Sequence, residues 1–162
     1  MDSVSEARLG VVHPLLTAKV RMMADILEPE AIIFRVTQGL RTWAEQAALY
    51  AQGRTAPGKI VTNAAPGASY HNYGLAVDVV PMTIEGPDWN EQHPVWSRLV
   101  SVGTSLGLVA GAQFRSFPDQ PHFQLTGSLP VSPDEHVREL FSIGGITSVW
   151  RMAFPDDMVV PA

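Results

Sequence analysis

The sequence predicts an α+β fold, in which helices and a few short strands form a single domain over residues 1–162. Apolar residues recur at helical spacing in some segments, and short β-rich runs bounded by proline or glycine occupy others. The expected order is helix, strand, helix, loop, strand, helix, two strands and a helical tail. This order is more typical of an α+β fold than of a wound parallel sheet.

The first third of the chain is expected to form two helices around one strand. Apolar residues share one face over 14–27, and this segment begins with a proline that suits a first helical turn. The run AIIFRV at 31–36 is rich in strand-forming residues. Thr42, with Glu45 three residues later, is typical of a capping box, so a second helix should begin there and stop before Gly53.

The remaining chain is expected to contain one long loop and several short elements. Residues 54–68 are rich in Gly, Pro, Ala and Thr, which predicts a loop. Alternating apolar residues predict a strand at 74–80, and residues 81–94 are polar and turn-rich. The later predictions are a helix at 95–106, strands at 107–114 and 121–125, and two short helices near 133–141 and 146–152.

The composition excludes several classes of function. Eleven basic against sixteen acidic residues give a net charge of −5, and no basic stretch resembles a nucleic-acid footprint. There are no cysteines, so a cysteine nucleophile is excluded and any metal must be held by histidine and carboxylate. No apolar run is long enough to span a bilayer, and the start does not resemble a signal peptide. We therefore expect a protein made in the cytoplasm, without membrane insertion. We also expect a monomer.

The segment SYHNYGLAVDVV at 69–80 places a hydroxyl, an imidazole and a carboxylate close together in the sequence. One interpretation is a serine-hydrolase triad of Ser69, His71 and Asp78. The other is that His71 and Asp78 are two ligands of a metal. A second segment, FPDQPHFQL, adds His122 at a predicted strand edge, with Asp119 three residues before it.

The metal interpretation needs ligands of the kind that these residues supply. Catalytic zinc is usually held by three nitrogen or oxygen ligands with one position open, and two histidines with one aspartate match that set. Zinc lowers the pKa of a bound water to about 7, which provides hydroxide at neutral pH. A second carboxylate must then accept the proton of the water and pass it to the leaving amine, and Asp119 is the natural candidate.

Three segments together resemble a known family of zinc peptidases. SYHNYGLAVDVVP resembles the motif S-x-H-x-x-G-x-A-x-D of the family that includes VanY-like D-Ala-D-Ala carboxypeptidases and phage L-alanyl-D-glutamate endolysins. SFPDQPHFQL resembles its second motif, D-x-P-H-F, and GLRTWAEQAALYAQGR is similar to its G-x-R helix entry. The resemblance covers about residues 36–125, and the tail after 126 lies outside it.

The resemblance implies a site, a fold and a substrate. It implies His71, Asp78 and His122 as ligands of one zinc ion, and a hedgehog-type fold with a small antiparallel sheet and flanking helices. It implies peptidoglycan stem peptides as substrate and Arg41 as the partner of a substrate carboxylate or oxyanion. Asp119, where the carboxypeptidase branch typically has glutamate, favours the endolysin branch, which cleaves L-Ala-D-Glu. The alternative is a D-Ala-D-Ala carboxypeptidase. An endolysin, encoded by a phage or prophage, would act on the wall after release.

Other interpretations remain open at this stage. Ser69 could bind substrate or serve as a turn serine, and Tyr73 could line the cleft or pack in the core. A serine hydrolase is disfavoured because its three residues would all come from one segment and no G-x-S-x-G elbow is present. A zinc-holding module without catalysis is disfavoured because a structural zinc needs no second carboxylate such as Asp119.

Overall fold

The computed structural model describes residues 1–156 and divides the chain into two compact units. The first, called here the sheet unit, consists of Met1–Leu40 and Leu75–Leu125. The second, called the helical unit, consists of Arg41–Gly74 and the described residues from Thr126 onward. Among the described residues, no helix is long and apolar enough to cross a membrane.

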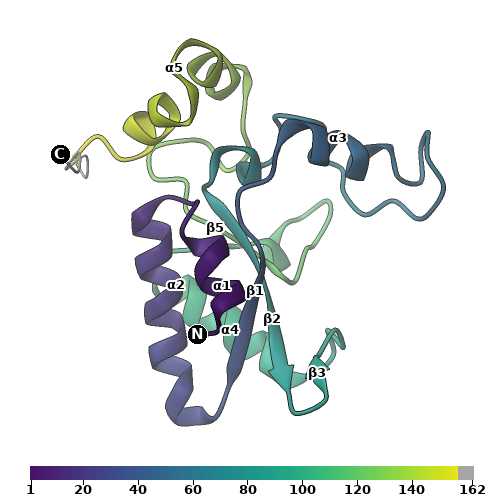
Figure 1. Ribbon diagram of the computed structural model, residues 1–162, viewed down its shortest axis with the longest axis vertical. Coiled ribbons are helices and arrows are strands. Elements are labelled where there is room, and N and C mark those ends of the chain that lie inside the picture. Colours follow the sequence, from purple (N-terminus) through teal and green to yellow (C-terminus); the bar gives the residue numbers. More distant parts are fainter. Residues whose placement is uncertain (157–162) are drawn as a thin grey trace. The chain divides into compact units, whose positions relative to one another are not determined.

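The sheet unit contains one antiparallel sheet with the strand order β1-β2-β5-β4. Strands β1, β2, β3 and β5 of this sheet are labelled in Figure 1. The strand β3 pairs with β2 outside this path. This sheet and its flanking helices confirm the predicted α+β fold. The strand bounds are β1 Ile33–Gln38, β2 Ala76–Thr83, β3 Gly86–Pro87, β4 Val109–Ala110 and β5 His122–Gln124.

Two helices contribute buried side chains to the core of the sheet unit. Helix α2 (Pro14–Leu27) begins at the predicted proline, and its buried residues recur at helical spacing. Helix α4 (Pro94–Ser105) contacts α2 and buries Gly103 against β5. A Cβ atom on Gly103 would lie 2.4 Å from the ring of Phe123, so the missing side chain makes room for that ring. The ring of Phe123 is fully buried, which anchors β5.

Three parts of the sheet unit differ from the sequence prediction. Helix α1 (Ser3–Leu9) was not predicted, because seven residues give too short a pattern to stand out. The strand predicted at 107–114 is only the two-residue β4, followed by the 3₁₀ helix η3 (Gly111–Gln113). The turn-rich segment at 81–94 contains the end of β2 and the short partner β3. A further 3₁₀ helix, η1 (Glu28–Glu30), follows α2.

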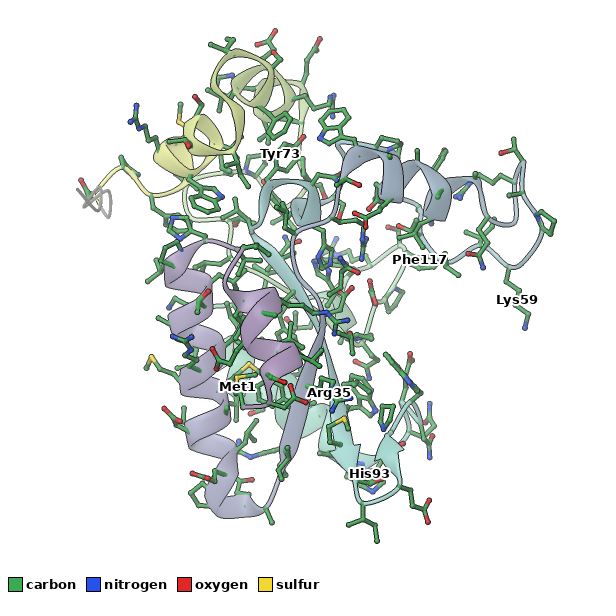
Figure 2. The ribbon with its side chains drawn as sticks, in the orientation of Figure 1. Met1, Arg35, Lys59, Tyr73, His93 and Phe117 are labelled. Carbon is green, nitrogen blue, oxygen red and sulfur yellow. The ribbon has the colours of Figure 1, made fainter. Side chains whose placement is uncertain are left out.

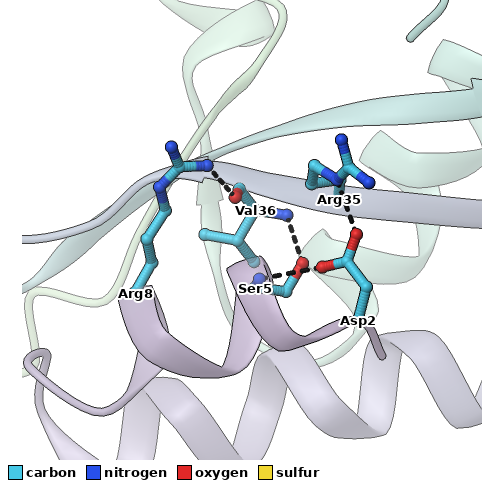
Figure 3. A network of polar contacts seen from close by, with 5 residues as sticks. All are labelled: Asp2, Ser5, Arg8, Arg35 and Val36. Atoms are coloured by element: carbon cyan, nitrogen blue, oxygen red, sulfur yellow. Dashed lines mark hydrogen bonds and ion pairs between the residues drawn. The ribbon is translucent and has the colours of Figure 1, made fainter. Parts of the chain in front are cut away.

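Side chains of helix α1 form hydrogen bonds with the backbone of Val36, on the edge of β1 that has no neighbouring strand (Figure 3). The backbone N–H of Val36 donates to Ser5 Oγ at 2.9 Å, and Arg8 Nη1 donates to the carbonyl of Val36 at 2.7 Å. Asp2 caps the helix by accepting from Ser5 N, and this hydrogen bond lowers the pKa of Asp2 to about 2. The cap is therefore complete above the ordinary carboxyl pKa and is lost as the pH falls toward 2.

Replacing Ser5 with alanine should destabilise the protein because it leaves the buried N–H of Val36 without its acceptor. The expected cost is about 1–3 kcal/mol in the free energy of unfolding, measured by urea denaturation. Ser3→Ala, on the exposed side of the same helix, is the matched control. If Ser5→Ala unfolds at the same urea concentration as Ser3→Ala, the hydrogen bond from Val36 N to Ser5 Oγ does not contribute to the stability of the fold.

The helical unit is built from α3 (Trp43–Ala51), the 3₁₀ helix η2 (Tyr70–Tyr73) and α5 (Glu135–Ala153). The capping box of Thr42 and Glu45 is present as predicted, and α3 ends before Gly53, which has a φ of +74°. Helix α5 has non-helical backbone angles at Gly144 and Gly145. The tail is therefore two helical segments separated by a kink, as the sequence predicts.

Candidate metal centre

Asp78 and His122 lie opposite each other on neighbouring strands. Asp78 of β2 is the register partner of His122 of β5, and Asp78 Oδ1 is 3.4 Å from His122 Nδ1. Directly opposite residues of antiparallel strands have their Cβ atoms only about 4.5–5.5 Å apart, which brings such side chains into contact. The side chains are 18% and 8% exposed, so the pair is largely shielded from water.

The alternation of the strands separates this pair from the apolar core. Val77, Val79 and Phe123 are fully buried, and Phe123 meets Gly103 of α4. Successive side chains of a strand point to opposite faces, so Asp78 and His122 project from the other face of the sheet. Asp78 lies in the middle of an apolar strand, but the alternation of side chains along the strand keeps its carboxylate out of the apolar core.

Asp119 is held beside His122 by a tight turn. Its N–H donates to the carbonyl of Gly111 at 3.0 Å, and its own carbonyl accepts from His122 N at 3.2 Å. The turn passes directly over Gly111, where a Cβ atom would lie 2.6 Å from Asp119 O and 2.7 Å from His122 Cβ. The structure therefore brings together the imidazole and the second carboxylate that the sequence predicts.

The carboxylates of Asp78 and Asp119 favour a positive charge on the imidazole of His122. Burial alone lowers the pKa of His122, but the hydrogen bond and charge of Asp78 oppose it. The hydrogen bond of Gln124 and the charge of Asp119 act in the same direction as Asp78, and the net pKa is raised. A divalent cation beside the imidazole would be stabilised by the same carboxylates.

Replacing Gly111 with alanine should disturb the site more than the fold. Its new Cβ atom would displace the turn that carries Asp119 and His122, and overpacking of this kind costs about 1–3 kcal/mol. We expect hydrolysis to fall while the protein stays folded by circular dichroism. Gly10→Ala is the matched control, because the nearest atom to its Cβ would be at an ordinary 3.5 Å. Full hydrolysis by Gly111→Ala would show that the turn tolerates displacement.

His71 lies in the helical unit, on η2. It is 2% exposed, its N–H donates to Ser69 Oγ at 3.3 Å, and its carbonyl accepts from Arg41 N at 2.9 Å. Gly74, with a φ of +62°, ends this turn immediately before the segment that becomes β2. Ser69 therefore acts as the cap of η2, which is the turn-serine role. Its hydroxyl accepts from a backbone N–H of His71, as a cap does, so this contact gives no support to a serine triad.

Tyr73 packs in the core of the helical unit. Its side chain is 0% exposed, its hydroxyl donates to Gly67 O at 2.8 Å, and burial raises its pKa to about 12. The ring meets Phe141 of α5 edge to face, and Figure 2 shows Tyr73 on the side of α5. Trp150 Nε1 donates to the carbonyl of Tyr73 at 2.7 Å. This burial is what we expect of a residue that packs in the core, and it does not support the predicted contact of Tyr73 with substrate.

Arg41 is held by a residue that the sequence prediction did not single out. Arg41 Nη1 donates to Gln46 Oε1 at 2.9 Å, and Gln46 Nε2 donates to Ala64 O at 2.7 Å. Gln46 is fully buried on α3, so its amide ties the guanidinium to the long loop. A glutamine on the inner face of an otherwise alanine-rich helix was the signal in the sequence that could have pointed to it.

A buried imidazole facing one carboxylate, with a second carboxylate beside it, supplies the kinds of group that metallohydrolase sites use. Comparison with known proteins agrees with this class. A family model described as D-alanyl-D-alanine carboxypeptidase matches residues 62–125. The chain is 34% identical over 122 residues to the peptidoglycan L-alanyl-D-glutamate endopeptidase CwlK of Bacillus subtilis, covering 70% of this chain and 73% of that protein.

Solved structures show the same fold. The L-Ala D-Glu endopeptidase ChiX of Serratia marcescens has 26% identity and a TM-score of 0.57, with 78% of this chain and 89% of ChiX covered. The vancomycin-resistance D,D-pentapeptidase VanY with Zn(II) has 18% identity and a TM-score of 0.53, with 70% of this chain and 71% of VanY covered. At 18% identity, the likeness to VanY shows only that this chain has the same fold.

The chain belongs to the M15 family of peptidases. It is a metallopeptidase that acts on peptidoglycan, which confirms the class of enzyme predicted from the sequence.

Proposed function

We propose that this chain is a zinc-dependent endopeptidase that hydrolyses the L-Ala-D-Glu bond of peptidoglycan stem peptides. The observation that carries the proposal is the facing pair of Asp78 and His122, with Asp119 held by backbone hydrogen bonds in the turn that leads to His122. Two relatives support the choice of bond, since CwlK and ChiX are both named as L-Ala-D-Glu endopeptidases.

In this proposal, zinc is held by His71, Asp78 and His122. Each offers one ligand atom, two from imidazole nitrogen and one from a carboxylate, and this donor set could hold a metal ion. Nitrogen and carboxylate oxygen are the ligands of catalytic zinc sites, so the residues fit the metal. When bound, zinc polarises the scissile carbonyl and makes water a stronger acid.

Asp119 is the general base of the proposed reaction. Its carboxylate accepts a proton from the attacking water and then delivers that proton to the leaving amine of the cleaved bond. Its backbone hydrogen bonds to Gly111 and His122 fix the turn that carries the carboxylate before substrate binds. A preorganised base of this kind needs no rearrangement during the reaction.

Arg41 is proposed to hold the oxyanion or a substrate carboxylate, and Ser69, whose oxygen caps η2, to donate its hydroxyl hydrogen to the peptide. The planar fork of a guanidinium suits both a carboxylate and a polarised carbonyl. Gln46 fixes one arm of this fork at 2.9 Å, which orients the group. Tyr73 has a supporting role only, because its ring and hydroxyl lie in the core of the helical unit.

A second candidate function is removal of the terminal D-Ala of the stem peptide. The description of the matching family model, D-alanyl-D-alanine carboxypeptidase, favours it. A carboxypeptidase must pair the terminal carboxylate of its substrate with a cation near the metal. An endopeptidase must leave that side open for the continuing chain. Arg41 could serve either arrangement.

Digestion of purified sacculi and of a synthetic stem pentapeptide should distinguish the two functions. We expect mass spectrometry to show fragments that end at L-Ala and begin at D-Glu, with no free D-Ala. Release of free D-Ala while the L-Ala-D-Glu bond stays intact would move the chain to the carboxypeptidase function. Heat-inactivated protein is the control for breakdown of the sacculi during incubation.

The proposed enzyme acts on the cell wall as a monomer. Its relatives are named for peptidoglycan cleavage, which requires the protein to reach the wall. We propose release of the folded protein through a partner that opens the inner membrane, as expected for a lysin encoded by a phage or prophage.

A further inference from the structure

We propose that Gln124 is a positioning residue that sets which nitrogen of His122 faces the metal. Its side-chain carbonyl keeps the hydrogen of the imidazole on Nε2, so that Nδ1 presents its lone pair toward Asp78. This inference rests on the proposed function, because it concerns the way in which His122 binds zinc.

Both ring nitrogens of His122 have a defined neighbour. Nε2 lies 2.9 Å from Gln124 Oε1, and Nδ1 lies 3.4 Å from Asp78 Oδ1. A neutral imidazole carries one hydrogen, and an amide oxygen can only accept, so the contact with Gln124 places that hydrogen on Nε2. In this neutral ring Nδ1 is an acceptor that faces a carboxylate, an arrangement that a cation bound by both atoms would stabilise.

The local packing explains why Gln124 can reach His122. The two residues are two apart on β5, so their side chains project from the same face of the strand. The register partner of Gln124 on β2 is Ala76, whose small side chain leaves room on that face. Gln124 is only 3% exposed, so the hydrogen bond is shielded from water.

A buried partner of this kind both orients the ring and raises its basicity. Metal-binding histidines usually donate their second N–H to an oxygen acceptor, and loss of that acceptor typically lowers metal affinity by about 10–100-fold. The signal in the sequence was the pattern H-F-Q, in which a polar residue recurs two positions after a candidate ligand on a short apolar strand.

The test compares Gln124→Met with Gln124→Glu. Methionine has a similar length but lacks the oxygen acceptor, whereas glutamate keeps one. We expect zinc affinity, measured by competition with a chelator, to fall about 10–100-fold in Gln124→Met and to be retained in Gln124→Glu. Urea unfolding of the zinc-free proteins should show that both variants are folded. In the zinc-loaded wild type, ¹⁵N NMR of His122 should show Nε2 protonated and Nδ1 bound.

Two outcomes would overturn this inference while leaving the zinc site in place. One is wild-type zinc affinity in a folded Gln124→Met. The other is an NMR signature in which Nε2 of His122 is the bound nitrogen. A wild-type chain that binds no zinc at His122 would instead overturn the proposed function and this inference with it. The two failures are therefore distinguishable.

Discussion

Replacing Asp119 with asparagine is expected to lower hydrolysis of stem peptides about 10²–10⁴-fold while zinc remains bound. The amide cannot accept the proton of the attacking water, although its size and its backbone hydrogen bonds to Gly111 and His122 are retained. The measurement is the turnover rate on a stem peptide, together with the zinc content of the same sample. Asp25→Asn, an exposed carboxylate on α2, is the matched control.

Three results would separate the possible roles of Asp119. Low activity with full zinc content is the result we predict. Near-wild-type turnover by Asp119→Asn would remove Asp119 from the mechanism. Loss of zinc along with activity would make it a ligand rather than a base. In Asp119→Glu we expect partial activity, because the longer arm can still reach the water.

Replacing Asp78 with alanine is expected to abolish zinc binding and, with it, hydrolysis. The variant leaves His122 without the carboxylate that lies 3.4 Å from its Nδ1. In the wild type, zinc should stabilise the fold by about 2.7 kcal/mol when free zinc is a hundred times its Kd. Unfolding with and without zinc measures this difference, and we expect it to disappear in Asp78→Ala.

Asp25→Ala is the control for removal of a carboxylate, and it should keep both the zinc content and the zinc-dependent stabilisation. If Asp78→Ala binds zinc as tightly as this control, Asp78 is not a ligand. If it fails to fold without zinc, Asp78→Asn keeps the shape of the side chain and can be compared instead.

The sequence predicted the parts of the fold that depend on local signals. Helix α2 begins at Pro14, and the capping box of Thr42 and Glu45 starts α3, because each signal acts within one turn of helix. The two glycines at 144 and 145 similarly divide the tail. Helix α1 depends instead on a tertiary contact, since Ser5 and Arg8 are held by the edge of β1.

The candidate site was predictable where a residue's chemistry is rare in its context. Asp78 within an apolar strand and His122 at a strand edge stood out for that reason, and the register of β2 and β5 brings them together. Gln46 and Gln124 were missed because their roles depend on partners distant in space or on the face of a short strand. The sequence could not decide whether Tyr73 lines the cleft or packs in the core. Its burial in the structure favours packing.

The most direct test of the central claim is anomalous X-ray diffraction at the zinc absorption edge from crystals of the zinc-loaded protein. We predict one strong peak, coordinated by His71, Asp78 and His122, with the histidine nitrogens about 2.0–2.1 Å from the peak. A peak held by other residues, or no peak in crystals of protein that hydrolyses peptidoglycan, would contradict the account.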